Sequence, residues 1–294
     1  ALGRPVRWTA ERTEEFLAAT HGRDVVSHAE LALDANGRVL GYRVRSLADV
    51  GAYAGTTGIL IQVLIGPWVS TSIYDIKTID FVFDAVLTNT TPTAAYRGAG
   101  RPEAAYLLER LVDVCAREMN LDPAEIRARN FIKQTQMPFH TLTDRDYDVG
   151  DFEGAMRACL ERADRAGFDA RAAESKSRGK ARGFGFASYI ECTAWGDGEE
   201  GAVTLNKDGT LTVAIGTQST GQGHETAYAQ VVSEQFDVPL ERIKVIQGDT
   251  AAIPTGNGTG GSRSIAVGAV MVNRASAKLA ASLKELAADK LEAA

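Results

Sequence analysis

Two glycine-rich stretches in the last third of the sequence carry the residues best suited to binding a ligand. They read GTQSTGQGHETAYAQ (216–230) and GNGTGGSRS (256–264), and each opens a predicted helix. Glycine lets backbone N–H groups approach a ligand closely, and the start of a helix offers unpaired donors at its positive end. Since only about one strand and one helix separate the two stretches, we expect them to cradle one large anionic ligand.

A third stretch, AYRGAGRPEA (95–104), has the same glycine-rich character and adds two arginines, Arg97 and Arg101. Planar guanidinium groups suit phosphate, so this stretch is a third candidate anion-binding loop. For Arg101, a solvent-exposed surface charge is the simpler interpretation.

The loop at 216–230 holds two side chains that could recognise a ligand. Gln222 stands between Gly221 and Gly223, and its amide can donate and accept hydrogen bonds at once, as recognition of a heterocycle or an oxo group requires. His224 follows directly and could contact the same ligand. Taken alone, a structural helix cap is the simpler explanation. The loop is neither a P-loop nor a dinucleotide fingerprint, because no Lys-Ser or Lys-Thr follows the glycines and GxGxxG is absent.

The loop at 256–264 ends in Ser262, Arg263 and Ser264, which combine hydroxyls, a guanidinium group and free N–H groups. The competing interpretation is an N-capping serine beside a solvated arginine. Asp249 and Glu191 lie near the glycine loops and are candidates for a general base, although a solvated carboxylate is the better interpretation of each.

Composition limits the class of protein. The chain has 294 residues, 45% of them hydrophobic, with a net charge of −6, so it can bury a sizeable core and carries no long basic run. A nucleic-acid partner is therefore not expected. The longest apolar segment, Ile59–Val69, has about half the length that a bilayer requires, so no membrane span is expected.

The cysteines do not form a recognisable site. Cys115, Cys159 and Cys192 are far apart and form no CxxC pair, which favours a reducing compartment without a disulfide framework, zinc or an iron–sulfur cluster. Cys115 falls on the apolar face of a predicted helix, where core packing is expected. The remaining histidines, which have no partners at ligand spacing, are His21, His28 and His140.

The first half of the chain should position the Arg97 loop. Alternating patterns on both sides of Asn36-Gly37 predict a hairpin of Val25–Asp34 and Arg38–Val50, and Thr78–Thr88 alternates as a further strand. A helical pattern follows over Glu103–Met119. Two more helices are predicted, one starting at the cap Asp122-Pro123 and one over Phe152–Ala166.

The second half should position the glycine loops. It contains a predicted strand at Gly183–Glu191, a hairpin of Ala202–Asn206 and Leu211–Gly216, a helix at Glu225–Phe236, a strand at Arg242–Gln247 and a long terminal helix. Strands and helices are grouped rather than strictly alternating, which favours an α+β fold. The expected organisation is a first subdomain at 1–168, a charged linker at 169–182 and a second subdomain at 183–294.

Three motifs in this order and spacing resemble a known family. AYRGAGRPEAAYLLERLVD, GQGHETAYAQ and GTGGSRS are similar to the molybdenum-binding large subunits of the xanthine dehydrogenase/aldehyde oxidase superfamily, and most similar to the large chain of aerobic carbon monoxide dehydrogenase and its relatives. The resemblance runs through nearly the whole chain, including the opening GRPVRWTAERTEEF and the later ARNFI. It implies a pair of α+β domains that clamp a molybdopterin.

The resemblance also implies roles for individual residues. Arg97 matches the arginine of the active-site loop and Gln222 the glutamine near the molybdenum, so both are expected to be catalytic. No residue is expected to ligate the metal directly, because molybdenum is held through the pterin dithiolene. The residues expected to bind the cofactor are Arg97, Gly98, Gly221, Gln222, Gly223, His224, Thr259, Gly261, Ser262, Arg263 and Ser264.

The implied reaction is oxidative hydroxylation of an electron-poor carbon in a small molecule, with oxygen taken from water. The implied cofactor is molybdopterin with molybdenum, in the cytosine dinucleotide form. Electrons would leave through an iron–sulfur small subunit and an FAD-containing medium subunit, in a dimer of heterotrimers. A cytoplasmic location follows, with peripheral attachment to a membrane left open.

Two departures from the family pattern qualify the resemblance. The copper-binding cysteine of true carbon monoxide dehydrogenases is replaced by Gly98, so an aldehyde, a purine or another N-heterocycle is at least as good a substrate as carbon monoxide. The family's glycine-phenylalanine-glycine loop and its catalytic glutamate have no match here and are expected before residue 1 and after residue 294. We therefore expect an internal fragment that is inactive alone. The alternatives are a true carbon monoxide dehydrogenase, a catalytically degenerate scaffold that binds the cofactor, and a nucleotide-binding protein of unrelated fold.

Overall fold

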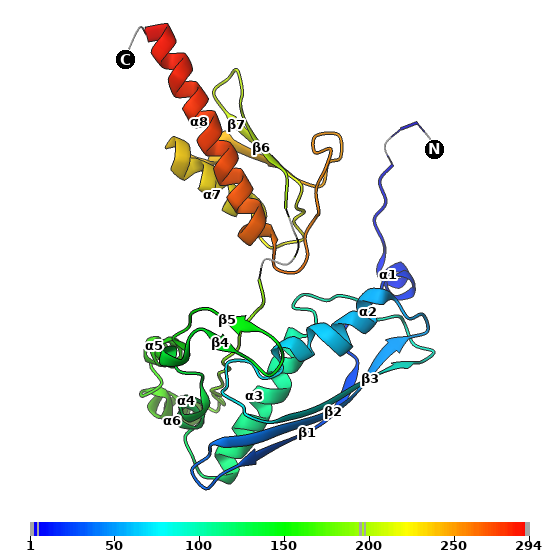
Figure 1. The fold of residues 1–294 in the computed structure, drawn as a ribbon, viewed down its shortest axis with the longest axis vertical. Helices are drawn as coiled ribbons and strands as arrows, with labels where there is room; N and C mark the ends of the chain where they lie inside the picture. Colours follow the sequence, from blue (N-terminus) through cyan, green and yellow to red (C-terminus); the bar gives the residue numbers. More distant parts are fainter. Residues whose placement is uncertain (1–2, 5, 194–195, 197, 292–294) are drawn as a thin grey trace. The chain divides into compact units, whose positions relative to one another are not determined.

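The chain folds into two compact units, Ala1–Glu191 (unit 1) and Cys192–Ala294 (unit 2), in a computed structural model (Figure 1). The structure describes residues 3–4, 6–193, 196 and 198–291. Each unit has its own small sheet and its own cluster of buried hydrophobic side chains. Strands and helices combine in the α+β class that the sequence predicts.

Unit 1 is built on a three-stranded sheet in the order β1-β2-β3. Strands β1 (Val25–Leu33) and β2 (Val39–Gly51) pair antiparallel, and β3 (Ile79–Leu87) pairs parallel to β2. Between β1 and β2, the Asp34 carboxylate accepts the backbone N–H groups of Asn36 and Arg38, both at 2.8 Å. The predicted hairpin and third strand are therefore confirmed.

Helix α3 (Arg101–Glu118) covers one face of this sheet (Figure 1). Its buried residues Leu108, Val112 and Ala116 recur every four positions and pack in one core with Val44 of β2. The helix begins two residues before the predicted start and directly follows the Arg97 loop.

The other elements of unit 1 are short. Helix α4 begins where predicted, because the Asp122 carboxylate accepts the backbone N–H groups of Ala124 and Glu125. The remaining elements are α1 (Arg12–Ala18), α2 (Thr56–Leu60), the π-helical turn η1 (Ile61–Ile65), the 3₁₀ turns η2 (Pro67–Val69) and η3 (Gln134–Gln136), α4 (Pro123–Asn130), the two-residue pair β4 (Phe139–His140) and β5 (Asp146–Tyr147), α5 (Phe152–Arg162) and α6 (Phe168–Ser177).

The segment expected to be a linker, 169–182, is mostly helical, because α6 covers its first nine residues. Alanine, arginine, glutamate and lysine are strong helix formers, so a charged segment rich in small residues suits a surface helix as well as a linker. The division between the units falls later, after Glu191.

The predicted strand at 183–191 is wrong for the described chain, in which these residues form no ladder. The segment is still half-buried on one side, where Phe186 and Ile190 pack against the core of unit 1. The N–H of Ser188 donates to the buried Glu109 carboxylate at 2.8 Å rather than to a strand. The alternating pattern thus reflects one buried face without a neighbouring strand.

Unit 2 holds a second three-stranded sheet, in the order β6-β7-β8. Strands β6 (Gly201–Leu205) and β7 (Leu211–Ile215) form the predicted antiparallel hairpin, and β8 (Ile243–Ile246) lies parallel to β7. Helix α7 (His224–Phe236) connects β7 to β8. The turns η4 (Leu240–Arg242) and η5 (Ser264–Ala269) and the terminal helix α8 (Val270–Leu291) complete the unit.

The core of unit 2 fixes where the two glycine loops begin and end. Tyr228 and Val232 of α7 and Val272 of α8 are fully buried against Val213 and Ile215 of β7. The first loop runs from the end of β7 to the start of α7, and the second runs from β8 to η5. Both loops are therefore anchored at each end in one core.

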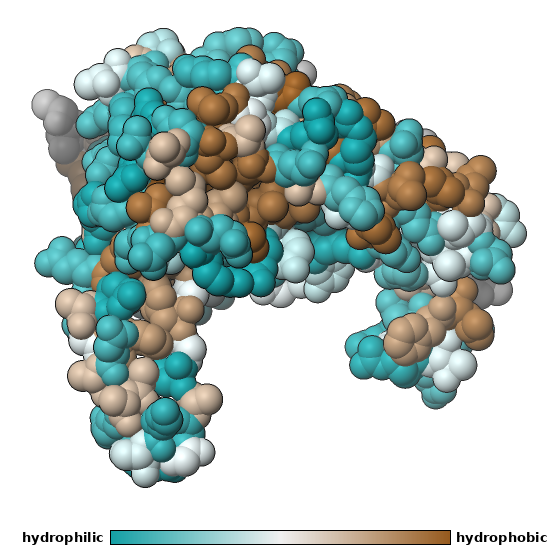
Figure 2. Space-filling model, turned by 90° about the horizontal axis from the view of Figure 1, so that it is seen from below, coloured by the Kyte–Doolittle hydropathy of each residue, from teal (hydrophilic) through white to brown (hydrophobic). Residues whose placement is uncertain are grey.

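The surface mixes hydrophobic and hydrophilic residues, in patches that Figure 2 shows for one face. On the sheet of unit 1, Val26, Leu47, Val82 and Val86 are exposed. Among the described residues, no helix combines the length and the hydropathy needed to cross a membrane.

Candidate functional site

The two glycine loops of unit 2 touch through their backbones. A Cβ atom added to Gly216 would lie 2.6 Å from the Cα of Gly256 and 2.2 Å from Oε1 of Glu199. Real Cβ atoms do not come so close, so glycine is required where the loops meet. The two loops that the sequence singled out therefore lie side by side.

Hydrogen bonds also join the loops. The Oγ1 atom of Thr259 accepts the backbone N–H of Gln218 at 2.9 Å, and the hydroxyls of Thr259 and Ser264 are 2.9 Å apart. Both residues were expected to bind cofactor, and both connect loop segments here.

Tyr228 is a residue of this region that sequence reasoning missed. Its side chain is fully buried, its hydroxyl donates to the backbone carbonyl of Ser264 at 2.7 Å, and it lies 2.8 Å from Oγ1 of Thr217. Burial raises the pKa of Tyr228, so it stays a protonated donor. The spacing of His224, Tyr228 and Val232 on one face of α7 was the available signal.

Several glycines of the loops face open space rather than protein. Gly221, Gly223 and Gly258 have φ angles of 102°, 78° and 73°, and no described atom lies within 4 Å of a Cβ added to them or to Gly260. Bare backbone therefore faces open space at these four glycines. Such a surface fits a ligand that approaches backbone N–H groups closely.

Gln222 stabilises its own loop. Its Oε1 atom accepts the backbone N–H of Thr220 at 2.5 Å, and the side chain is half-buried. This bond uses the carbonyl oxygen of the side-chain amide, and the two N–H donors are on the amide nitrogen. The side chain is thus held in a fixed orientation within the glycine loop.

His224 is the first residue of α7 and is 5% exposed. Its Nδ1 atom is buried without a hydrogen-bond partner among the described residues, and its ring centroid lies 5.9 Å from that of Tyr228. Helix α7 begins after Gly223 without a side-chain cap. A buried nitrogen without a partner and uncapped helical N–H groups are features that a bound polar group would satisfy.

Arg263 is not the solvated arginine of the competing interpretation. It is 5% exposed, and its NH1 atom donates to Oε2 of Glu199 at 2.6 Å. Ser262 has a left-handed backbone (φ 56°) and Gly261 follows the same pattern (φ 60°). The tip of the second loop is therefore tightly curled around a buried ion pair.

The Arg97 loop belongs to unit 1, and its backbone is left-handed over three consecutive residues. Gly98, Ala99 and Gly100 have φ angles of 94°, 45° and 85°. A Cβ added to Gly98 would lie 2.4 Å from Cγ of Pro102. Glycine at this position is therefore required by the turn into α3, while the Arg97 side chain is exposed.

The surface interpretation of Arg101 is wrong. Arg101 is 6% exposed, its Nε atom lies 3.2 Å from Oε1 of Glu191, and NH1 donates to the carbonyl of Gly98 at 3.3 Å. Its partner is distant in the sequence, so local pattern could not show the pair. Glu191, which the sequence offers as a candidate general base, is the counter-ion of this buried arginine.

Arg23 also holds this loop and was not singled out from the sequence. Its guanidinium group donates to the carbonyl of Arg97, lies 4.5 Å from the ring centroid of Tyr96 and is 3.4 Å from the Glu103 carboxylate. Two guanidinium groups, from Arg23 and Arg101, thus bind successive carbonyls of the loop.

The described residues contain no group of three or more His, Cys, Asp and Glu side chains that could hold a metal ion. Cys115 borders the core of unit 1, and burial raises the pKa of its thiol. This agrees with a packing role for Cys115.

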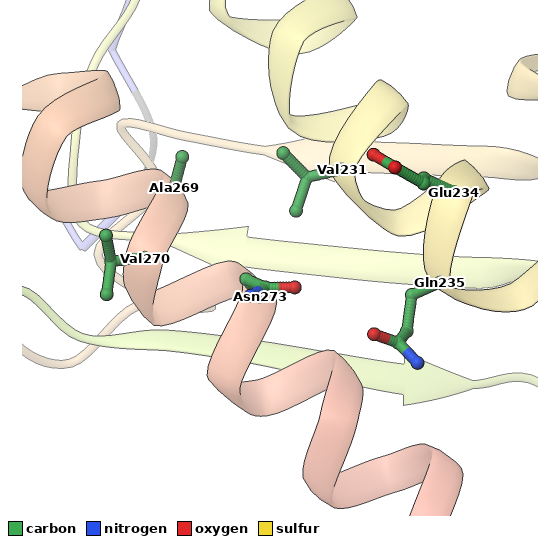
Figure 3. A pocket seen from close by; sticks show the side chains of 6 residues that line it. All are labelled: Val231, Glu234, Gln235, Ala269, Val270 and Asn273. Carbon is green, nitrogen blue, oxygen red and sulfur yellow. The ribbon is translucent and has the colours of Figure 1, made fainter.

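A pocket of about 500 Å³ lies between α7 and α8 (Figure 3). Among the described residues it is lined by Val231, Glu234, Gln235, Ala269, Val270 and Asn273, none of which the sequence predicted to bind cofactor. The pocket is thus distinct from the glycine loops.

Comparison with known proteins defines the class. Two family models, each described as a molybdopterin cofactor-binding domain, match the chain. One matches residues 1–131 and the other matches residues 158–294. The chain belongs to the molybdopterin-binding large subunits of the xanthine dehydrogenase/aldehyde oxidase family. The predicted family is thereby confirmed.

Individual relatives are similar along the whole chain. The carbon monoxide dehydrogenase large chain of Hydrogenophaga pseudoflava is 36% identical over 99% of this chain and 38% of the relative. The 6-hydroxypseudooxynicotine dehydrogenase complex subunit gamma of Paenarthrobacter nicotinovorans is 32% identical over 99% and 37%. The structure of quinoline 2-oxidoreductase from Pseudomonas putida 86 matches with a TM-score of 0.83 and 32% identity, covering 100% of this chain and 39% of that one. The chain thus spans under two fifths of these relatives.

Proposed function

We propose that this chain is part of the catalytic large subunit of a molybdenum hydroxylase and that the glycine loops of unit 2 bind its molybdopterin. The observation that carries the proposal is the junction of the two loops, where glycine backbone faces open space, together with the uncapped start of α7 and the unpaired Nδ1 atom of His224. The bound cofactor would supply the two-electron chemistry that hydroxylates an electron-poor carbon with oxygen from water.

The residues of the chain have the following proposed roles. Gln222, oriented by its bond to Thr220, presents its amide N–H groups to the cofactor near the metal. The backbone N–H groups at the start of α7 and in the second loop bind its anionic groups. Arg97 of unit 1, whose carbonyl is held by Arg23, has the catalytic role that the family resemblance implies.

The remaining parts of the enzyme lie outside residues 1–294 in this proposal. They are the glutamate that acts as general base, the iron–sulfur small subunit and the FAD medium subunit, assembled as a dimer of heterotrimers in the cytoplasm. The names of the relatives, a large chain and a complex subunit, support a multi-subunit enzyme. Their similarity supports the cytosine dinucleotide form of the cofactor.

For the substrate, we infer an N-heterocycle or an aldehyde rather than carbon monoxide. Relatives named for quinoline and for a nicotine derivative support the heterocycle. A copper–molybdenum site would need a cysteine at residue 98, where the left-handed backbone and the nearby ring of Pro102 leave no room for a side chain.

The test is a substrate panel on the full-length subunit purified with its partner subunits. Reduction of an artificial electron acceptor should occur with N-heterocycles or aldehydes, and copper should be absent from the preparation. Turnover of carbon monoxide with one copper per subunit would overturn the assignment of substrate.

A further inference from the structure

Among the described residues of unit 2, Glu199 and Arg263 form a deeply buried ion pair. The side chain of Glu199 is 0% exposed and that of Arg263 is 6% exposed, and NH1 donates to Oε2 at 2.6 Å. A buried pair of this kind is kept only where both charges are well compensated, because an unpaired buried charge is strongly destabilising. Water therefore has little access to either charged group.

Both side chains also bind backbone atoms. Arg263 donates from NH1 to the carbonyl of Gly258 at 3.1 Å and from NH2 to the carbonyl of Gly198. Oε1 of Glu199 accepts the backbone N–H groups of Glu200 at 3.1 Å and of Asn257 at 3.3 Å. The pair therefore connects the second glycine loop to the segment that leads into β6.

The Glu199 carboxylate lies at the junction of both glycine loops. Its Oε1 atom is the nearest neighbour of a Cβ added to Gly216 and lies 3.1 Å from one added to Gly256. The two loops thus meet against this one carboxylate. A change at Glu199 would act on both loops at once.

We propose that Glu199 and Arg263 are positioning residues, which set the shape of the second glycine loop and do not bind the cofactor themselves. The inference rests on the proposed function and differs from the resemblance, which makes Arg263 a ligand of pterin or phosphate. Three N–H donors of the Arg263 guanidinium group bind Glu199 and the carbonyls of Gly258 and Gly198, so the group is held against the protein. If it turned away toward a phosphate, the buried Glu199 carboxylate would lose its counter-ion.

Two variants of the full-length subunit, purified with its partners, separate these roles. In Glu199→Gln, a phosphate-binding Arg263 would be released toward the ligand, so pterin content would stay the same or rise. A positioning pair predicts that pterin content falls about tenfold or more, because both loops lose their common anchor.

Arg263→Lys keeps a positive charge beside the buried Glu199 carboxylate, so we expect this variant to fold. Lysine also binds phosphate, and a ligand role therefore predicts that pterin is retained. A positioning role predicts loss, because an ammonium group lacks the planar fork that reaches Glu199, Gly258 and Gly198 together. Glu200→Gln, which neutralises the adjacent exposed carboxylate, is the matched control and should leave pterin content unchanged.

The measurements are pterin released per subunit and the thermal midpoint of each preparation. Pterin loss in both variants, with a folded protein and a normal control, is the expected result. Normal pterin content in Arg263→Lys or Glu199→Gln would overturn the positioning role. Absence of pterin from the wild-type complex would instead overturn the proposed function, so the two failures are distinguishable.

Discussion

At the scale of single residues, the loops of unit 2 contain two kinds of polar side chain. Side chains of the first kind form hydrogen bonds within the loops, as Thr259, Ser264 and Tyr228 do. The second kind is represented by His224, whose Nδ1 atom has no hydrogen-bond partner in the described chain. The first kind determines the shape of the loops. A bound ligand would supply the hydrogen bond that a side chain of the second kind lacks.

Gln222→Ala should lower cofactor content and leave the fold intact. Among the described residues, the half-buried side chain makes one hydrogen bond, to the N–H of Thr220, so its loss should cost about 1 kcal/mol of unfolding free energy at most. Pterin per subunit and the thermal midpoint should be measured together on the full-length complex. Unchanged pterin content and turnover would remove Gln222 from the site.

Buried tyrosines should make stability depend on alkaline pH. Burial raises the pKa of Tyr42, and burial together with the Glu109 carboxylate raises that of Tyr74. An unfolded tyrosine ionises at about pH 10, so the folded state holds protons that the unfolded state releases above that pH. The contribution is fully present below about pH 10 and is lost as pH rises through the folded-state pKa.

The measurement is the free energy of unfolding of the chain against pH, compared with Tyr42→Phe. The wild type should lose stability above about pH 10, and the variant should lose less. Equal slopes for the two proteins would contradict a buried, proton-retaining Tyr42.

At the scale of elements, both units use the same arrangement. An antiparallel hairpin is followed by a third strand parallel to its second strand, with a helix over the sheet. The candidate loops lie where the chain enters α3, α7 and η5. Helix starts and glycine backbone together are the features that we propose bind anionic groups.

The role of the open space at the glycine loops can be tested by adding one methyl group. Gly260 has space around an added Cβ and does not adopt a left-handed conformation, so Gly260→Ala should fold normally. Its methyl group would occupy space that the ligand needs, so pterin content should fall. Gly185→Ala, which also meets no described atom, is the control in unit 1. Full pterin content in both variants would place the ligand elsewhere.

Local signals predicted the elements well, and distant partners explain what they missed. Asn36-Gly37, the Asp122 cap and the glycine loops were predictable because neighbouring residues determine them. The burial of Arg263 depends on Glu199, 64 residues away, and the burial of Arg101 depends on Glu191. The alternation of polar and apolar residues at 183–191 could not show that this segment contacts helix α3 instead of pairing with a strand.

At the scale of the whole molecule, the two units have separate cores, and each glycine loop of unit 2 begins and ends within its own unit. Residues 192–294 should therefore fold without unit 1. Circular dichroism and thermal unfolding of that segment should show one cooperative transition. A gradual, non-cooperative melt would mean that the core of unit 2 depends on unit 1.

We propose above that the glycine loops of unit 2 bind molybdopterin. The most direct measurement is molybdenum and released pterin nucleotide in the full-length subunit, purified with its partners from a host that makes the cofactor. We expect about one molybdenum and one pterin per subunit. A folded, correctly assembled complex without either would contradict it, and the glycine loops would then be helix caps.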